Sequence, residues 1–133
     1  MKKLFLAAAA VSVISACPAF AATINVAAGD GAQERLQEAL INAQPGDVVE
    51  LAAGKFVLTD GLSLDVDKVT VKGQGEKETI LDFTNQQGAG EGLLVTSDDV
   101  ILRDFAVENS KGDGIKSKDA NRIVYNQLRV EWT

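Results

Sequence analysis

The chain has 133 residues, 46% of them hydrophobic, and a formal net charge of −6. A chain of this length folds as a single domain, and its acidity argues against binding to a nucleic-acid backbone, which needs clustered Lys and Arg. Because the chain has no histidine and only one cysteine, Cys17, zinc sites and Ser-His-Asp hydrolysis are poor candidates.

Residues 1–22 have the pattern of a bacterial secretory signal peptide. A basic start precedes an apolar run over residues 4–16, too short to span a membrane as a helix, and Ala19-Phe20-Ala21 is a small-x-small cleavage site. A competing cut exists, because Ile14-Ser15-Ala16-Cys17 resembles a lipoprotein signal in which Cys17 carries a lipid anchor. We prefer the Ala-Phe-Ala site. With either cut we expect export to the periplasm, the cell envelope or the outside, with no transmembrane span in the mature chain.

Residues 23–46 are predicted to form a first strand, over residues 23–26, and an amphipathic helix, over residues 32–44. Asp30 and Gln33 resemble a capping box at the start of this helix, and Pro45-Gly46 ends it. One helical stripe is apolar and comprises Leu36, Ala39, Leu40 and Ala43. A helix this short is marginal in isolation, so we expect it to cap the open end and strand edge of the segment that follows.

Residues 47–133 are predicted to form stacked coils of short strands. Their apolar residues come in pairs two apart, which places both members on one face of a strand. The spacings of three and four that a helical repeat needs are absent. The pairs are 49/51, 56/58, 62/64, 69/71, 93/95, 100/102 and 105/107, and residues 79–83 are read as a further strand.

An internal repeat indicates how these strands stack. The segment that begins at Gly92 recurs from Gly114, 22 residues later, and a partial copy begins at Gly61. The alignment places Leu93 on Ile115, Val95 on Ser117, Leu102 on Tyr125, Phe105 on Leu128, Val107 on Val130 and Glu108 on Glu131. Such a period built from alternating runs indicates a solenoid, here an all-β parallel β-helix of about 3–4 coils with the helix as its N-terminal cap. A leucine-rich repeat is the alternative, but it expects a leucine-dense strand followed by asparagine, which is absent.

The run from Leu36 to Phe56, with Pro45-Gly46-Asp47 in its centre, resembles the cap helix and first coil of secreted right-handed parallel β-helix proteins. That superfamily includes pectate lyases, polygalacturonases and alginate epimerases. With the segments 62–67, 91–99, 111–116 and 130–133, the mature chain is similar to a bacterial group of exported β-helix repeat proteins without an assigned activity. The resemblance implies a right-handed, single-stranded coil. Because such proteins have many more coils, we expect residues 47–133 to be truncated at the C-terminus, or their open end to be covered by another subunit.

Polysaccharide lyases of this superfamily typically hold Ca²⁺ with acidic side chains on adjacent coils and remove a proton with Arg or Lys. Ca²⁺ needs several converging oxygen ligands, but the alignment places Asp104 under Gln127 and Asp98 under Ala120. Glu108 under Glu131 is a stacked acidic pair, which is repulsive unless a cation or solvent screens it. The acidic candidates are Asp98, Asp99, Asp104, Asp113 and Asp119. We interpret Asp98, Asp99 and Asp113 as turn residues and the stacked pair as a solvated edge, so no metal site is predicted.

The basic candidates Arg103, Lys116 and Arg129 alternate outward along their strands and are interpreted as a solvated face. Ile101 and Val124, which also point outward, suggest a small apolar contact strip. Trp132 either stacks on a sugar ring or packs under a further coil. The sequence therefore identifies no catalytic residue and no cofactor site, with calcium as the only ion considered.

Two functions are compatible with these residues. The first is an exported scaffold segment without catalytic activity, whose partner is a polysaccharide or a cell-envelope protein. The alternative is the N-terminal part of a polysaccharide lyase or epimerase, whose active site lies on coils missing from this chain. Fold alone does not decide between them.

Overall fold

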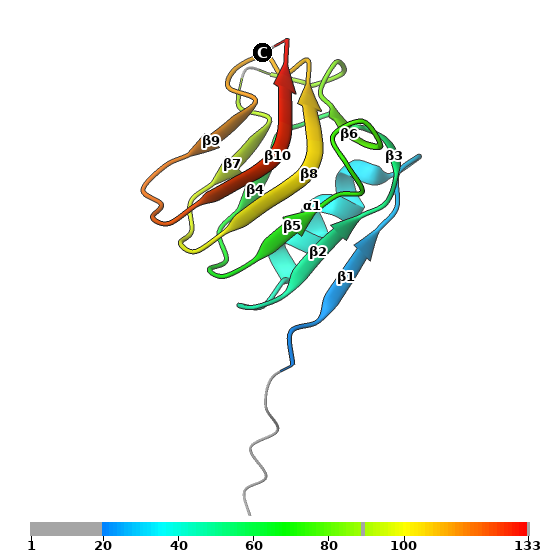
Figure 1. Cartoon of the computed structure of the whole chain (residues 1–133). Coiled ribbons are helices and arrows are strands. Elements are labelled where there is room, and N and C mark those ends of the chain that lie inside the picture. The colour runs from blue at the N-terminus through cyan, green and yellow to red at the C-terminus, as the bar shows by residue number, and fades with distance from the viewer. Residues whose placement is uncertain (1–19, 89, 133) are drawn as a thin grey trace, which may run out of the picture.

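The computed structural model describes residues 20–88 and 90–132 (Figure 1). The predicted leader, with the lipidation candidate Cys17, therefore lies outside the described residues except for its last three. The elements are β1 (Thr23–Val26), α1 (Ala32–Asn42), β2 (Val48–Leu51), β3 (Gly54–Val57), β4 (Leu62–Leu64), β5 (Thr70–Lys72), β6 (Thr79–Asp82), β7 (Leu93–Val95), β8 (Ile101–Glu108), β9 (Ile115–Ser117) and β10 (Val124–Glu131).

The strands form two sheets of parallel pairs. The larger sheet has seven strands in the order β1-β2-β5-β8-β6-β3, with β10 paired to β8 as well, and the smaller sheet has the order β4-β7-β9. Strand β8 has two neighbours on one side, because β5 pairs with its first half and β6 with its second half. The larger sheet curls into a half-barrel, and the smaller sheet lies across the interior from it (Figure 1).

The predicted all-β, right-handed parallel β-helix, and with it the description of the chain as a solenoid, is wrong. The structure is a mixed α/β fold with one helix, a curled half-barrel sheet and a second sheet. Its strands β8 and β10 each run for eight residues, through a bend at Asp104 (φ 60°) and Gln127 (φ 52°). The prediction places the pairs 100/102 and 105/107 on separate strands of two sheets. In the structure residues 102, 105 and 107 all belong to the continuous strand β8, and residue 100 directly precedes it.

The strand pairings predicted from the internal repeat are nevertheless confirmed. Leu93 pairs with Ile115 and Leu62 pairs with Leu93 in the smaller sheet. In the larger sheet Phe105 pairs with Leu128 and Val107 with Val130. The repeat therefore gave the register correctly, although it did not give the sheet architecture.

The interior between the sheets is filled by aliphatic and phenylalanine side chains. Phe56, Phe83 and Phe105 are fully buried, as are Leu102 and Val107. Burial of each such side chain contributes about 1.5–3 kcal/mol, so this interior is the main source of stability.

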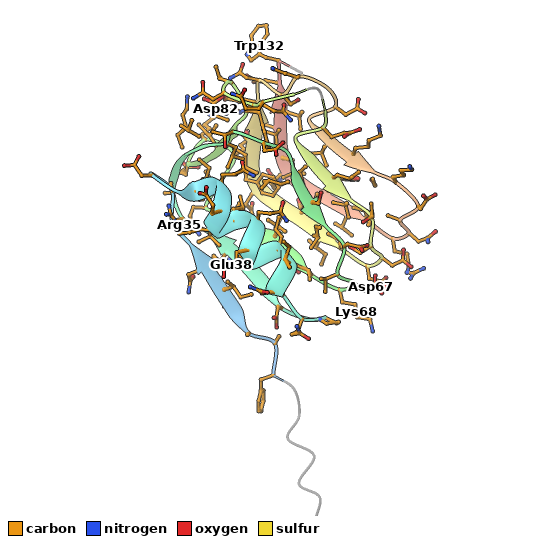
Figure 2. The ribbon with its side chains drawn as sticks, turned by 180° about the vertical axis from the view of Figure 1, so that it is seen from behind. Arg35, Glu38, Asp67, Lys68, Asp82 and Trp132 are labelled. Atoms are coloured by element: carbon orange, nitrogen blue, oxygen red, sulfur yellow. The ribbon has the colours of Figure 1, made fainter. Side chains whose placement is uncertain are left out.

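Helix α1 lies over the start of this interior (Figure 2), with its apolar stripe turned inward. Leu36 and Leu40 are buried, and the helix contacts β1, β3 and β4. The predicted capping box is wrong, because Gly31 occupies the N-cap position with φ 75° and makes no side-chain capping bond.

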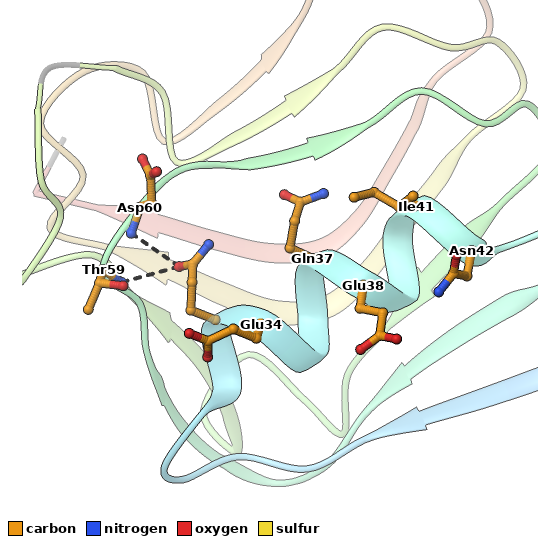
Figure 3. A pocket seen from close by; sticks show the side chains of 8 residues that line it. Glu34, Gln37, Glu38, Ile41, Asn42, Thr59 and Asp60 are labelled. Atoms are coloured by element: carbon orange, nitrogen blue, oxygen red, sulfur yellow. Dashed lines mark hydrogen bonds between the residues drawn. The ribbon is translucent and has the colours of Figure 1, made fainter.

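Two glutamine side chains of α1 take the place of a neighbouring strand beside β4. Gln37 Oε1 accepts from the Ser63 N–H at 2.9 Å, and Gln37 Nε2 donates to the Ser63 carbonyl at 3.0 Å. Gln33 Oε1 accepts from the N–H groups of Thr59 and Asp60 at 3.2 and 3.1 Å (Figure 3). Since exposed strand edges invite unwanted pairing, these amides close one edge of the smaller sheet.

Gly73 follows β5 and lies against the backbone at the bend in β8. A Cβ at this position would overlap the Asp104 carbonyl oxygen and lie 2.9 Å from Thr79 Cβ. We expect Gly73→Ala to lower the free energy of unfolding in urea by about 1–3 kcal/mol, because the bend in β8 must move. Gly90→Ala is the matched control, since a Cβ there meets nothing within 4 Å, and it should change stability by less than about 0.5 kcal/mol. Equal losses would contradict this account.

Candidate functional site

The candidate site is the end of the molecule away from α1, which we call the β10 end and define by Val124, Tyr125, Leu128, Val130 and Trp132. Within residues 20–88 and 90–132, β10 pairs only with β8 and β9 pairs only with β7. The outer backbone edge of each strand therefore has no strand partner there. Figure 1 shows both strands on the side of the molecule opposite α1.

The β10 end repeats the apolar pattern of β8 without the cover that β8 has. Leu102 and Val107 are 0% exposed because β10 lies on them. Their counterparts on β10, Tyr125 and Val130, are 50% and 45% exposed. Side chains that continue the interior are thus left facing solvent, which is typical of a surface that binds another chain.

Tyr125 connects the two sheets at the β10 end. Its hydroxyl group is hydrogen-bonded to the Ser117 hydroxyl group of β9. This bond links β10 of the larger sheet with β9 of the smaller sheet.

Trp132 follows β10 directly and is 77% exposed, with a left-handed backbone conformation (φ 56°). Its side chain projects from the end of the molecule (Figure 2). Tryptophan is enriched at binding surfaces because it combines a large apolar area with a polar N–H group.

An arginine holds together the stacked acidic pair beside the β10 end. Arg129 Nη1 lies 2.8 Å from Glu108 Oε1 and 2.9 Å from Glu131 Oε2, and Nη2 donates to the Glu76 carbonyl at 3.2 Å. The hydrogen bond that Arg129 donates to Glu108 raises the pKa of Arg129, with Glu131 adding to it. The interpretation of Arg129 as part of a solvated face is therefore wrong, since its guanidinium occupies the position considered for a cation.

The aspartates at the turn before β8 serve as backbone acceptors. Asp98 Oδ1 accepts from the Asn121 N–H at 2.8 Å, and Asp67 Oδ1 accepts in the same way from Asp98 at 2.8 Å. Asp99 is paired with Arg122 at 2.6 Å, and this hydrogen bond lowers the pKa of Asp99. These carboxylates connect successive turns, which agrees with their interpretation as turn residues.

The remaining candidates are dispersed. Arg103 pairs with Asp104 at 2.6 Å, and Lys116 pairs with Asp113 at 3.4 Å and with Glu91 at 2.8 Å. Asp119 is exposed and has a φ of 52°. Across the described part of the chain, no three His, Cys, Asp or Glu side chains come close enough together to form a metal-binding group.

The sequence reasoning missed a buried carboxylate on β6. Asp82 Oδ1 accepts from Thr84 Oγ1 at 2.6 Å and from Asn109 Nδ2 at 3.0 Å, and Lys55 Nζ lies 3.2 Å from Oδ2. Burial alone would raise the pKa of Asp82, but these hydrogen bonds outweigh it and lower the pKa to about 2. The group is charged and fully bonded, which indicates a structural role. Thr84 is close in sequence, but Asn109 and Lys55 are not, so no local motif identifies the whole set of partners.

A groove of about 510 Å³ runs along the outer side of α1 (Figure 3). It is lined by Gln33, Glu34, Gln37, Glu38, Ile41, Asn42, Thr59 and Asp60. The two glutamines on its wall are bonded to the backbone beside β4. This groove therefore lies on the side of the smaller sheet whose edge the α1 amides close.

Comparison of the chain with protein-family models, curated proteins and solved structures finds no match. Over residues 20–88 and 90–132, no helix is long and apolar enough to cross a membrane.

The hydrogen-bonded Asp82 carboxylate makes the free energy of unfolding depend on pH. A depressed carboxyl pKa stabilises the fold above the unfolded value, about 3.9, and the contribution is lost as pH falls toward 2. We expect Asp82→Asn to lose about 2 kcal/mol at pH 7 and to differ progressively less from wild type below pH 4. Urea denaturation from pH 2.5 to 7 measures this, and a constant difference across that range would contradict it.

Because Arg129 bridges Glu108 and Glu131, we expect calcium to leave the thermal stability of the wild-type protein unchanged. Arg129→Gln should lower the free energy of unfolding by roughly 1 kcal/mol, because Glu108 and Glu131 then face each other unbridged. Arg103→Gln is the control, since this exposed pair should contribute less than about 0.5 kcal/mol. Thermal melts with and without millimolar Ca²⁺ measure both, and a calcium-dependent rise in the wild-type Tm would mean that a metal site exists.

Proposed function

We propose that this chain is an exported, non-catalytic scaffold whose β10 end binds a protein partner by strand addition. The observation that carries the proposal is the coincidence of a free strand edge with exposed side chains that continue the interior. Val130 and Tyr125 lie on the buried face of β10 and are half-exposed. Strand addition supplies backbone hydrogen bonds to such an edge and covers alternate side chains.

The interface already formed between β8 and β10 indicates which partner fits. Leu102, Phe105 and Val107 pair with Tyr125, Leu128 and Val130 in parallel register. A further strand with apolar residues at the same three positions would bury the β10 side chains as β10 buries those of β8. The partner is therefore an extended polypeptide with this spacing rather than a sugar chain, because the matching apolar positions on β10 repeat those that β8 offers to a neighbouring strand.

Export is the second part of the proposal. It is supported by the leader-like pattern of residues 1–22, with a basic start, an apolar run and the Ala19-Phe20-Ala21 motif. The scaffold reading is favoured over a lyase because the paired and dispersed charges described above leave no candidate base or calcium cage among the described residues.

Trp132 is the single tryptophan of the chain and reports directly on the β10 end. We expect its fluorescence emission to shift to shorter wavelength when a synthetic peptide of residues 99–110, which contains β8, is added. Val130→Lys should weaken this binding at least about tenfold, because it places a charge in the added interface, whereas Ile41→Lys, on α1 at the other end, should not.

A peptide of the same composition in scrambled order is the negative control. Pectin and alginate oligosaccharides are tested in the same titration. A shift with the sugars alone would replace the protein partner with a carbohydrate, and release of unsaturated products from either polymer would overturn the non-catalytic assignment.

A further inference from the structure

The first residue that the fold holds firmly is Ala22. Its N–H group donates to Asp47 Oδ1 at 2.9 Å, and its carbonyl accepts from the Val48 N–H at 2.9 Å. The other carboxylate oxygen, Oδ2, accepts from the Gln44 N–H at 2.8 Å. Asp47 is 6% exposed. The hydrogen bonds from Gln44 and Ala22 lower its pKa, so the carboxylate is charged.

The residues before Ala22 are not held in this way. Phe20 is 86% exposed, and Ala21 is exposed as well. Within residues 20–22, the hydrogen bonds of the structure begin at Ala22. The peptide bond between Ala21 and Ala22 is also the bond that follows the Ala19-Phe20-Ala21 motif. The boundary of the fold and the boundary of the cleavage motif coincide, although one comes from contacts and the other from residue sizes.

We propose that the leader is removed by hydrolysis of the Ala21–Ala22 peptide bond and that the new α-ammonium group of Ala22 pairs with Asp47. Water adds across the amide, so that Ala21 leaves with a carboxylate and Ala22 keeps its nitrogen as an ammonium group. The neutral N–H···O bond thereby becomes a charge-assisted bond to a largely buried carboxylate. This inference rests on the export part of the proposed function.

The competing cleavage sites lack this match. Cleavage after Ala22 would remove the donor to Asp47 and the acceptor for Val48 together. Processing at Cys17 would leave residues 17–21 ahead of Ala22, so its nitrogen would stay a neutral amide. Asp47 would then be a buried charge with neutral donors only.

The test is the intact mass and N-terminal sequence of the full chain after expression in an exporting bacterium. We expect a mature chain that begins at Ala22. A chain that begins at Thr23, or at a lipid-modified Cys17, would overturn this inference while leaving export intact. A chain of all 133 residues retained in the cytoplasm would overturn export itself.

Thermal stability tests the ion pair separately. Asp47→Asn should lower the Tm by several degrees more in the processed protein than in the unprocessed chain made without export, because only the former has the ammonium partner. Asp30→Asn is the control, because Asp30 is an exposed acid in the loop between β1 and α1. It should lower the Tm of the processed and the unprocessed chain by the same small amount. Equal losses for Asp47→Asn in both forms would show that the ammonium group is not paired and would overturn the assignment.

Discussion

Parallel pairing to β8 is the interaction on which the rest of the structure depends. Strand β8 is paired along both of its edges, by β5 and β6 on one side and by β10 on the other. Its side chains Leu102, Phe105 and Val107 fill the centre of the interior. Because one strand carries three neighbours, the larger sheet must curl at the bend near Asp104, and the smaller sheet and α1 close the space that results.

Much of the register could be predicted from the sequence, whereas the architecture could not. The alternation of apolar residues and the repeat beginning at Gly92 and Gly114 report which residues stack, because stacked positions need similar side chains. Neither signal distinguishes a corner from a bend inside a strand. Asp104 and Gln127 adopt left-handed backbone angles within β8 and β10, a conformation for which a non-glycine residue gives no strong warning.

The candidate site shows a similar division. Alternation and position identify two exposed members of the β10 end, Val124 and Trp132, but not the exposure of Tyr125 and Val130. The roles of Arg129 and Asp82 were not identified, because each depends on partners that lie more than 20 residues away in sequence, such as Glu108 and Asn109. Pairs between residues this far apart produce no periodic pattern in the sequence from which they could be predicted. The capping box failed for a related reason, since Gln33 bonds to the backbone of Thr59 and Asp60 instead of to its own helix.

The amide side chains of Gln33 and Gln37 make the two edges of the smaller sheet different from each other. They satisfy the backbone beside β4 on one side of the smaller sheet, while β9 ends the other side. A second molecule therefore cannot add its own β9 edge beside β4, and head-to-tail stacking through this sheet is blocked. Two side chains of α1 thus prevent the repeated stacking of smaller sheets that would build a fibre.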